Sequence, residues 1–155
     1  VNLEKEYSLR VKDNCRCIPI GIKEGTNKTA LEMCVTEEHA GGKFLNATGE
    51  SGYNSAGGMH GLGTKCVNAL SDKMYVRSTR DGKTEYIEFI NGEKKTHKTE
   101  DFSGDYHGVQ VQFYPSLKYL EIIEFSPERL KTLIQEFSYL SKGLTFVFKD
   151  RINET

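Results

Sequence analysis

The sequence has almost no net charge and no long apolar run. It carries 21 Lys and Arg residues against 22 Asp and Glu residues, a formal net charge of −1. Such a chain has no global field to attract nucleic acid, so a DNA contact would need a local patch or another part of a larger protein. Because no stretch reaches the length of a membrane span and no charged-then-apolar leader opens the chain, we expect a cytoplasmic protein without a membrane partner.

Cysteine is also scarce. The four cysteines, Cys15, Cys17, Cys34 and Cys66, are too few and too scattered for a disulfide-dense secreted scaffold, which favours a reducing compartment. The Cys15-Arg16-Cys17 triplet leaves open a thiol-based metal or redox protein. A zinc site needs three or four converging ligands, however, and the remaining cysteines and histidines have no recognisable spacing, so we expect no metal site.

The composition and the sequence patterns indicate a single domain over residues 1–155. Hydrophobic residues make up 37% and charged residues 28%, as in a globular chain that can bury a core. The patterns predict, in order, a strand at 8–12, a helix at 29–39, a Gly-rich loop at 40–63, a helix from 64, strands at 74–80 and 84–90, a loop at 91–103, a strand at 108–115, a helix from 127 that ends at 143, and a strand at 144–148. We expect an α+β two-layer sandwich, a mostly antiparallel sheet with helices on one face.

Local signals set several of these boundaries. Asp81-Gly82 is a strong two-residue hairpin signal between two predicted strands. Ser126 suits a helix N-cap and Pro127 the first helical residue, while Gly143 suits the helix end. The apolar stripe of this helix would consist of Leu130, Leu133, Ile134, Phe137 and Leu140.

Asp13 is the first sign of a binding site. It follows a strand whose apolar face holds Leu9 and Val11, and it extends that apolar row. A buried carboxylate there costs free energy unless something donates hydrogen bonds to it. A ligand amine, such as the N6 group of adenine, would satisfy it, and a structural ion pair with Arg16 or Arg80 is the alternative.

The Gly-rich segment is the second sign. Eight of the fifteen glycines fall between residues 40 and 63, and a helical pattern follows Gly63 directly. Closely spaced glycines before a helix let backbone N–H groups approach a phosphate, although a plain flexible loop has the same composition. Lys43 would be a cation near that phosphate or, alternatively, a solvated lysine.

These features occur within longer motifs, namely "DNCRCIPIGI", "HAGGKF", "GGMHGLG" with "VNALS", "RDGK" and "GVQVQFYPS". Together they closely resemble the ATPase domain of the B subunits of DNA gyrase and topoisomerase IV. This family of type II DNA topoisomerases has the GHKL, or Bergerat, ATPase fold. The resemblance runs from Val11 to Asp150, through nearly the whole chain.

The resemblance implies a set of ATP-binding residues. Asp13 would bind the adenine amine, directly and through a water. The adenine pocket would be formed by Val11, Arg16, Ile18, Pro19, Cys34, Val35, Val109 and Val111. The phosphates would be wrapped by Gly57, Gly58, His60, Gly61, Leu62 and Gly63, with Lys43 and Tyr53 in the lid region. Arg80 would lie at the pocket mouth, where it also belongs to the coumarin-inhibitor site of this family.

The chain departs from the family pattern at several positions. The family has Asp-x-Gly-x-Gly where this chain has Cys15 and Cys17 in place of the glycines. A left-handed conformation at either position would cost about 1–2 kcal/mol with a Cβ. Val109 replaces a threonine whose hydroxyl helps to hold the adenine, and Asn54 replaces a lid lysine.

The resemblance also implies what the whole protein does. ATP binding with Mg²⁺ would be coupled to DNA strand passage, with DNA and the A-type subunit as partners of the full-length protein. In that family the catalytic glutamate and the Mg²⁺-binding asparagine lie on a helix that precedes the first strand, and we expect this chain to begin after that helix. We therefore expect this chain to hold no catalytic residue, to be monomeric and not to hydrolyse ATP. The alternative is a diverged or truncated nucleotide-binding module without catalysis.

Overall fold

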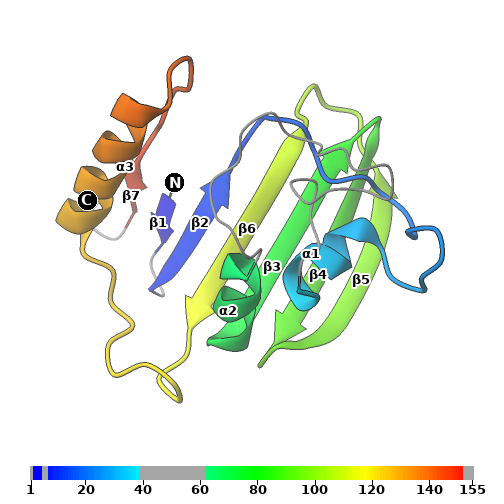
Figure 1. The fold of residues 1–155 in the computed structure, drawn as a ribbon, viewed down its shortest axis with the longest axis horizontal. Helices are drawn as coiled ribbons and strands as arrows, with labels where there is room; N and C mark the ends of the chain where they lie inside the picture. Colours follow the sequence, from blue (N-terminus) through cyan, green and yellow to red (C-terminus); the bar gives the residue numbers. More distant parts are fainter. Residues whose placement is uncertain (1, 5–6, 39–61, 152–155) are drawn as a thin grey trace.

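The computed structural model describes residues 2–4, 7–38 and 62–151, which form one sheet and three helices (Figure 1). In chain order the elements are β1 (Asn2–Glu4), β2 (Ser8–Lys12), α1 (Ala30–Thr36), α2 (Gly63–Ala69), β3 (Ser71–Arg80), β4 (Lys83–Ile90), β5 (Glu93–Asp101), β6 (Gly108–Pro115), α3 (Pro127–Leu140) and β7 (Lys149–Asp150).

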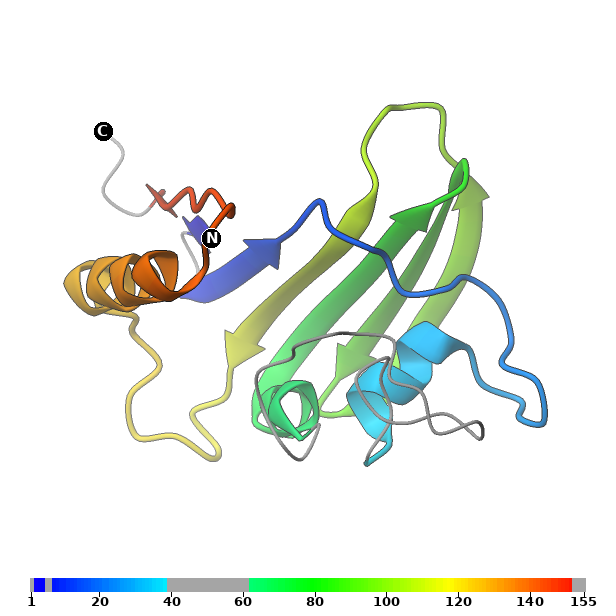
Figure 2. The ribbon, with the colours of Figure 1, turned by 45° about the horizontal axis from the view of Figure 1, so that its top comes forward.

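The sheet has the strand order β5-β4-β3-β6-β2-β1-β7. Every neighbouring pair is antiparallel except β1 and β7, which run parallel. Figure 2 shows α1 and α2 on the same side of this sheet. The predicted α+β fold, a mostly antiparallel sheet with helices on one face, is confirmed.

The hydrophobic core lies between α1 and the centre of the sheet. Paired positions place side chains of neighbouring strands on the same face, which produces rows of apolar residues across the sheet. One row runs through Val11, Val111, Val76 and Ile87, and the next through Leu9, Phe113, Met74 and Phe89. Leu31 and Val35 of α1 cover the buried part of these rows. Each fully buried side chain of this size stabilises the fold by roughly 1.5–3 kcal/mol.

Two tight turns shape the β3–β4–β5 meander. Asp81 and Gly82 have φ values of 51° and 72°, so the predicted hairpin is confirmed. Asn91 and Gly92 have φ values of 50° and 78° and form a second hairpin of the same kind, between β4 and β5. The predicted loop at 91–103 is therefore wrong, because most of it is β5. Asn-Gly is itself a strong hairpin signal, and the polar composition that follows belongs to an edge strand.

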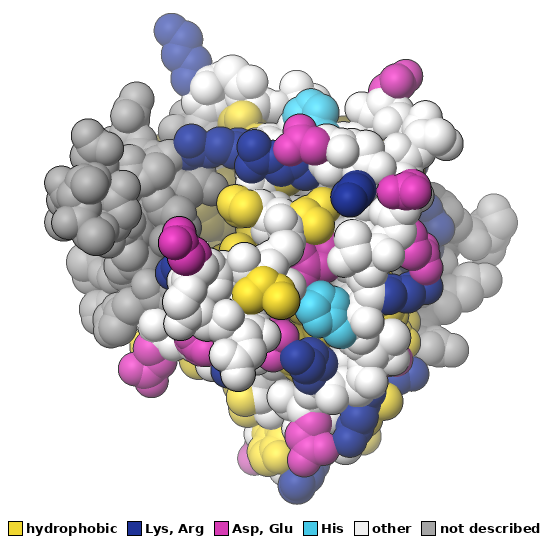
Figure 3. All heavy atoms as spheres, turned by 90° about the vertical axis from the view of Figure 1, so that its right-hand side faces the viewer, with side chains coloured by type: hydrophobic (Ala, Val, Ile, Leu, Met, Phe, Trp, Pro, Cys, Tyr) yellow, Lys and Arg dark blue, Asp and Glu magenta, His cyan; other side chains and the backbone are white. Residues whose placement is uncertain are grey.

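β5 is an edge strand that carries charge in place of apolar residues. The ion pairs Lys95–Glu93 and Lys98–Glu100 lie along it, each with an N–O distance of 2.8 Å. Figure 3, viewed from the β5 side, shows acidic and basic side chains intermixed over this surface. Charged edge strands disfavour pairing with another chain, which explains why a strand of the sheet has the composition of a loop.

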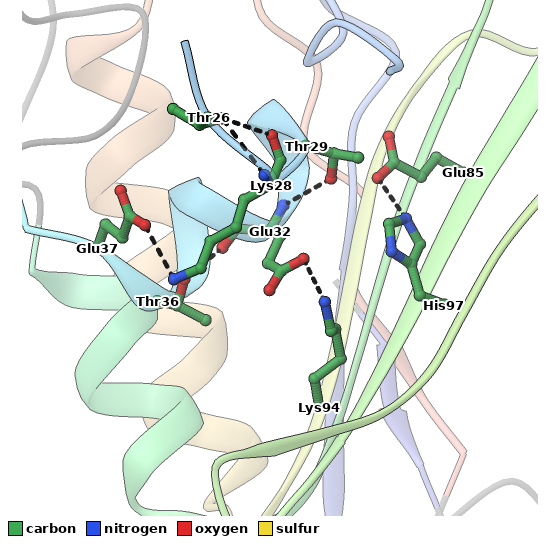
Figure 4. Close-up of polar contacts among 9 residues, drawn as sticks. All are labelled: Thr26, Lys28, Thr29, Glu32, Thr36, Glu37, Glu85, Lys94 and His97. Carbon is green, nitrogen blue, oxygen red and sulfur yellow. Dashed lines mark hydrogen bonds and ion pairs between the residues drawn. The ribbon is translucent and has the colours of Figure 1, made fainter. Parts of the chain in front are cut away.

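α1 is fixed by its cap and by ion pairs (Figure 4). The Thr29 side chain accepts a hydrogen bond from the N–H of Glu32 and so caps the helix. The buried Glu32 carboxylate pairs with Lys94 of β5 at 2.6 Å, which ties the helix to the sheet edge. The helix ends at Thr36, three residues before the predicted end at 39.

A second polar pair joins β4 to β5. Glu85 is fully buried, and its Oε1 lies 2.9 Å from His97 Nε2 (Figure 4). Its Oε2 has no hydrogen-bond partner among the described residues. A buried carboxylate of this kind depends strongly on its one partner, since desolvation of the charge is otherwise uncompensated.

α3 begins where predicted but ends at Leu140, before the predicted end at Gly143, and it does not bury its stripe. Ser126 caps the helix and Pro127 begins it, as predicted. No residue of α3 is buried among the described residues, and Phe137 is 51% exposed. The helix lies beside the β1–β7 edge, where the strands are too short to offer an apolar face (Figure 1). The strand predicted at 144–148 is wrong for the same reason, since only Lys149–Asp150 pairs with β1.

None of the helices in the described ranges is both long enough and apolar enough to cross a bilayer.

Candidate functional site

The turn that follows β2 centres on Asp13. The N–H of Asp13 donates to the carbonyl of Val109 at 3.0 Å, which extends the β2–β6 ladder by one residue. Asp13 Oδ1 then accepts the N–H groups of Cys15, at 3.0 Å, and of Val109, at 3.3 Å. Two backbone donors therefore hold one carboxylate oxygen and orient the group. Within the described part of the chain, both of these hydrogen bonds go to Oδ1 and neither goes to Oδ2.

The predicted burial of Asp13 is wrong. The residue is exposed, and backbone N–H groups of its own turn and of β6 satisfy the carboxylate in place of a buried partner. The alternative of an ion pair with Arg80 does not hold either, because Arg80 Nε pairs with Asp81 Oδ2 at 2.9 Å. Asp13 thus presents an oriented carboxylate at the surface, where a ligand could reach it.

The loop before β6 supports this turn, a feature that sequence reasoning missed. Tyr106 Oη donates to the Asp13 carbonyl at 2.7 Å, and His107 Nδ1 lies 3.3 Å from the Cys15 carbonyl. Burial, followed by the charge of Asp13, raises the pKa of Tyr106 to about 12. The hydroxyl therefore remains a donor at neutral pH. The signal that could have identified the loop is Gly108, the glycine that opens the "GVQVQF" motif.

Gly108 occupies a position where any side chain would collide with the Asp13 turn. Its φ is +144°, and a Cβ built on it would lie 2.0 Å from the Asp13 carbonyl oxygen and 2.7 Å from Tyr106 Oη. Real Cβ atoms do not approach backbone this closely. The glycine thus allows β6 to begin directly against the Asp13 turn.

The two cysteines in the turn behave differently. Cys17 is buried and its Sγ contacts the Thr79 carbonyl at 2.9 Å, whereas Cys15 is exposed. Positive φ outside glycine, within the described ranges, occurs only at Tyr7, Asp81 and Asn91, so neither cysteine bears left-handed strain. The Cys17 thiol points to β3, and its backbone stays outside the left-handed region.

Ile18 and Pro19 continue the chain across the sheet. The Ile18 carbonyl accepts a hydrogen bond from Ser78 Oγ at 2.7 Å, and Ile18 packs against the core. Val11 is 43% exposed although its row neighbours Val76 and Ile87 are buried. The apolar row is therefore open at its β2 end, beside Asp13.

Only some of the residues predicted to form the floor of the adenine pocket are exposed enough for a ligand to touch them. Val111 is half-buried against the core, and Val109 is half-buried and pairs with Ser78. Val35, in contrast, is 3% exposed and belongs to the core itself. Cys34 lies between these extremes, and burial raises the pKa of its thiol while nearby lysines act in the opposite direction.

Cys34 also connects α1 to the start of α2. Its carbonyl accepts hydrogen bonds from Thr64 Oγ1 at 3.0 Å and from Lys65 Nζ at 3.1 Å. Leu62 and Gly63 stand at the N-terminus of α2, where no side chain caps the helix. The predicted site residues Lys43, Tyr53, Gly57, Gly58, His60 and Gly61 lie outside the described residues.

Across the described ranges, no group of three His, Cys, Asp or Glu side chains is placed to hold a metal ion.

Comparison with known proteins identifies the class. The chain matches no protein-family model. It is 37% identical over 152 residues to the B subunit of DNA gyrase from Mycoplasmoides gallisepticum, and 38% identical over 153 residues to that from Thermotoga maritima. It is 35% identical over 157 residues to the B subunit of DNA topoisomerase 4 from Haemophilus influenzae. These alignments cover 97%, 99% and 100% of the chain, but the chain spans only about a quarter of each relative, 23%, 23% and 24%.

A comparison with solved structures points to the same family as the sequence matches. The topoisomerase IV ATP-binding domain of Francisella tularensis, solved with a small-molecule inhibitor, superposes with a TM-score of 0.78 at 28% identity. The match covers 99% of this chain and 70% of that one. The chain is thus a relative of the B subunits of type II DNA topoisomerases. More particularly, it corresponds to the ATP-binding segment of the DNA gyrase and topoisomerase IV B subunits.

Proposed function

We propose that this chain binds ATP as the nucleotide-binding core of a gyrase B-like protein, which couples ATP binding to DNA strand passage in its full-length form. The observation that carries the proposal is the Asp13 carboxylate, held by two backbone N–H groups through Oδ1. A carboxylate fixed in this way can accept a hydrogen bond from the adenine amine through Oδ2 without first giving up the donors that orient it.

The surroundings of Asp13 suit a purine. Val11 is exposed beside it and Ile18 crosses the sheet nearby, so apolar side chains can cover the faces of a base. Arg16, Pro19, Cys34, Val109 and Val111 complete the proposed pocket, and Arg80 would lie at its mouth. Val35 is buried in the core, so we assign it the role of supporting the floor and not of touching the base.

The assignment of the phosphate-binding residues rests on the family resemblance and on the N-terminus of α2. Uncapped N–H groups at Leu62 and Gly63 would face the phosphates, with the remaining glycines and Lys43 contributed by the preceding segment. ATP use by the relatives implies Mg²⁺, but the described residues offer no set of ligands for it. We therefore assign no step to a metal ion and no catalytic role to any described residue.

The larger assembly belongs to the same proposal. DNA and the A-type subunit would be partners through the full-length protein, in the cytoplasm, while this chain alone would be monomeric.

The test is calorimetric titration of the chain with a non-hydrolysable ATP analogue. Asp13→Asn should weaken binding by about 10–100-fold, because the amide can present a donor to the adenine amine, and an unpaired polar group costs about 1–3 kcal/mol. Replacing the adenine amine by the oxygen of inosine triphosphate should weaken binding to the native chain by a similar factor. In the variant, that preference should disappear.

Asp105→Asn is the matched control, since Asp105 is an exposed carboxylate on the loop that supports the turn. It changes the net charge equally and should leave affinity within about twofold. If both variants weaken binding alike, or if adenine and hypoxanthine nucleotides bind equally well, the role assigned to Asp13 is wrong.

A further inference from the structure

The turn after β2 carries two thiols that the proposed nucleotide site does not use. Cys15 and Cys17 are both free cysteines, and only Arg16 separates them in the sequence. Cys15 is exposed, whereas Cys17 is 8% exposed. A reagent in solution therefore reaches one thiol directly, while the second thiol is shielded within the same turn.

The backbone brings the two residues within the range of a disulfide. Cα atoms two residues apart in an extended chain are separated by about 6.6 Å, and the chain bends at Cys15 and Arg16, which shortens that separation. Disulfides join Cα atoms that are about 4.4–6.8 Å apart. Cys17 Sγ also turns back toward its neighbour, since it lies 3.7 Å from the Cys15 carbonyl oxygen. Closing a bridge between the two thiols therefore requires only local rotation within the turn.

The same two residues belong to the contacts that orient Asp13. The Cys15 N–H donates to Asp13 Oδ1 at 3.0 Å, and the Cys15 carbonyl oxygen lies 3.3 Å from His107 Nδ1. Cys17 Sγ contacts the Thr79 carbonyl oxygen of β3 at 2.9 Å. A bridge would remove Cys17 Sγ from Thr79 and change the backbone of the turn at Cys15. The Asp13 carboxylate would then lose one of the two N–H donors that fix it.

We propose that Cys15 and Cys17 form a reversible disulfide that lowers the affinity of the Asp13 site for ATP, an inference that rests on the proposed function. The oxidant is hydrogen peroxide. The Cys15 sulfur attacks one peroxide oxygen and the O–O bond breaks, so that a sulfenic acid and one water form. The Cys17 sulfur then attacks the Cys15 sulfur, the S–S bond forms as the S–O bond breaks, and the Cys17 proton leaves with the hydroxyl as a second water. Two thiols thus lose two electrons to one peroxide.

The position of the pair favours a bond that cellular thiols can reverse. Exposed or strained disulfides are the readily reduced ones, and a bridge between residues two apart closes a small ring at the surface. Such a short loop does little to restrict the unfolded chain, so the bond would add little stability. In a reducing compartment, disulfides are usually transient and either catalytic or redox-sensing. The pair therefore suits a sensor and not a structural cross-link.

The first test identifies the bond in the native chain without nucleotide. The chain is treated with hydrogen peroxide, denatured, alkylated and digested with trypsin, which cleaves between the two cysteines after Arg16. Peptides 13–16 and 17–23 should separate from the reduced chain and stay joined in the oxidised chain until dithiothreitol is added. On a non-reducing gel the oxidised chain should remain monomeric, because the bond is internal. A bridge to a cysteine of α1 or α2, or a sulfinic acid without any bridge, overturns the proposal.

Matched variants separate this pair from a general effect of oxidation. Cys17→Ser should abolish the joined peptides, and its hydroxyl can still donate to the Thr79 carbonyl, so the fold should be retained. Cys66→Ser removes another exposed thiol, on α2, and should leave the equilibrium constant of the bond in a glutathione titration within about twofold. Joined peptides from Cys17→Ser, or their loss from Cys66→Ser, would show that the pair is assigned wrongly.

The last test measures what the bond does to the nucleotide site. Calorimetry with the non-hydrolysable ATP analogue should show about tenfold weaker binding to the oxidised chain, the effect of about one hydrogen bond to a charged group, and dithiothreitol should restore the affinity. Because such coupling is reciprocal, a tenfold difference means that saturating analogue raises the midpoint potential of the pair by about 30 mV. Equal affinity of the two forms overturns the proposed regulation. Failure of both forms to bind the analogue refutes the proposed function, and the regulation with it, even where the first test finds the bond.

Discussion

Gly108 allows the sharpest test of how the Asp13 turn is built. Gly108→Ala places a Cβ 2.0 Å from the Asp13 carbonyl oxygen, and this contact must lengthen by about 1 Å to reach the shortest separation that real Cβ atoms tolerate. Three costs combine. The positive φ of +144° costs about 1–2 kcal/mol with a side chain. Displacing the Tyr106 hydroxyl loses about 0.5–1.5 kcal/mol, and the backbone shift adds to both.

We expect a loss of roughly 2–4 kcal/mol in the free energy of unfolding, measured by urea denaturation. Gly143→Ala is the matched control, because Gly143 also has a positive φ, of +87°, but a Cβ there meets nothing within 4 Å. It should lose only about 1–2 kcal/mol, the cost of the positive φ alone. Because the clash acts on Asp13, ATP affinity should also fall in Gly108→Ala and remain unchanged in Gly143→Ala. Equal stability losses in the two variants would refute the reasoning.

Three other variants test separate parts of the structure. Changing Cys15 and Cys17 to Gly should keep the fold, since neither residue is strained. If the thiols obstruct the base, calorimetry will show that the variant binds ATP more tightly than the native chain. Unchanged affinity would mean that the thiols do not obstruct it. His97→Ala should destabilise the chain by about 3 kcal/mol in urea, because it leaves the Glu85 carboxylate buried without a partner, and adding Glu85→Gln should restore most of the loss. The raised pKa of Tyr106, about 12, means that its stabilising contribution is complete below pH 10 and is lost as pH rises through 12, so Tyr106→Phe should flatten the alkaline decline in stability. An unaltered decline would show that Tyr106 does not cause it.

Much of the fold could be predicted from local patterns. The cap at Ser126 and Pro127, the hairpin at Asp81-Gly82 and the alternation in β6 each depend on residues close in sequence, and all three are confirmed. The Asn91-Gly92 hairpin carried an equally clear signal, but the run of lysines and glutamates after it has the composition of a loop. Charge on an edge strand protects against misassociation, and composition alone does not separate the two cases.

The site was less accessible to sequence reasoning. Asp13 was identified, but its exposure was not, because the donors that satisfy it come from its own turn and from β6. Tyr106 reaches the Asp13 carbonyl from 93 residues away, and only the folded sheet brings the two together. Patterns of period two or 3.6 describe which face a residue occupies, but they do not describe which distant loop lies against it.

The order of the strands has a consequence for biosynthesis. β3, β4 and β5 are joined by two-residue turns, so this meander can form early and locally as the nascent chain emerges. β1 and β2 are made first and pair with each other, but β2 can join the rest of the sheet only when β6 is made, since Leu9 pairs with Phe113. Loop closure over such a sequence separation is slow, and the Asp13 turn is therefore among the last parts of the domain to assemble. A ribosome-bound chain that stops before residue 108 would carry the complete meander and no purine-binding carboxylate in place.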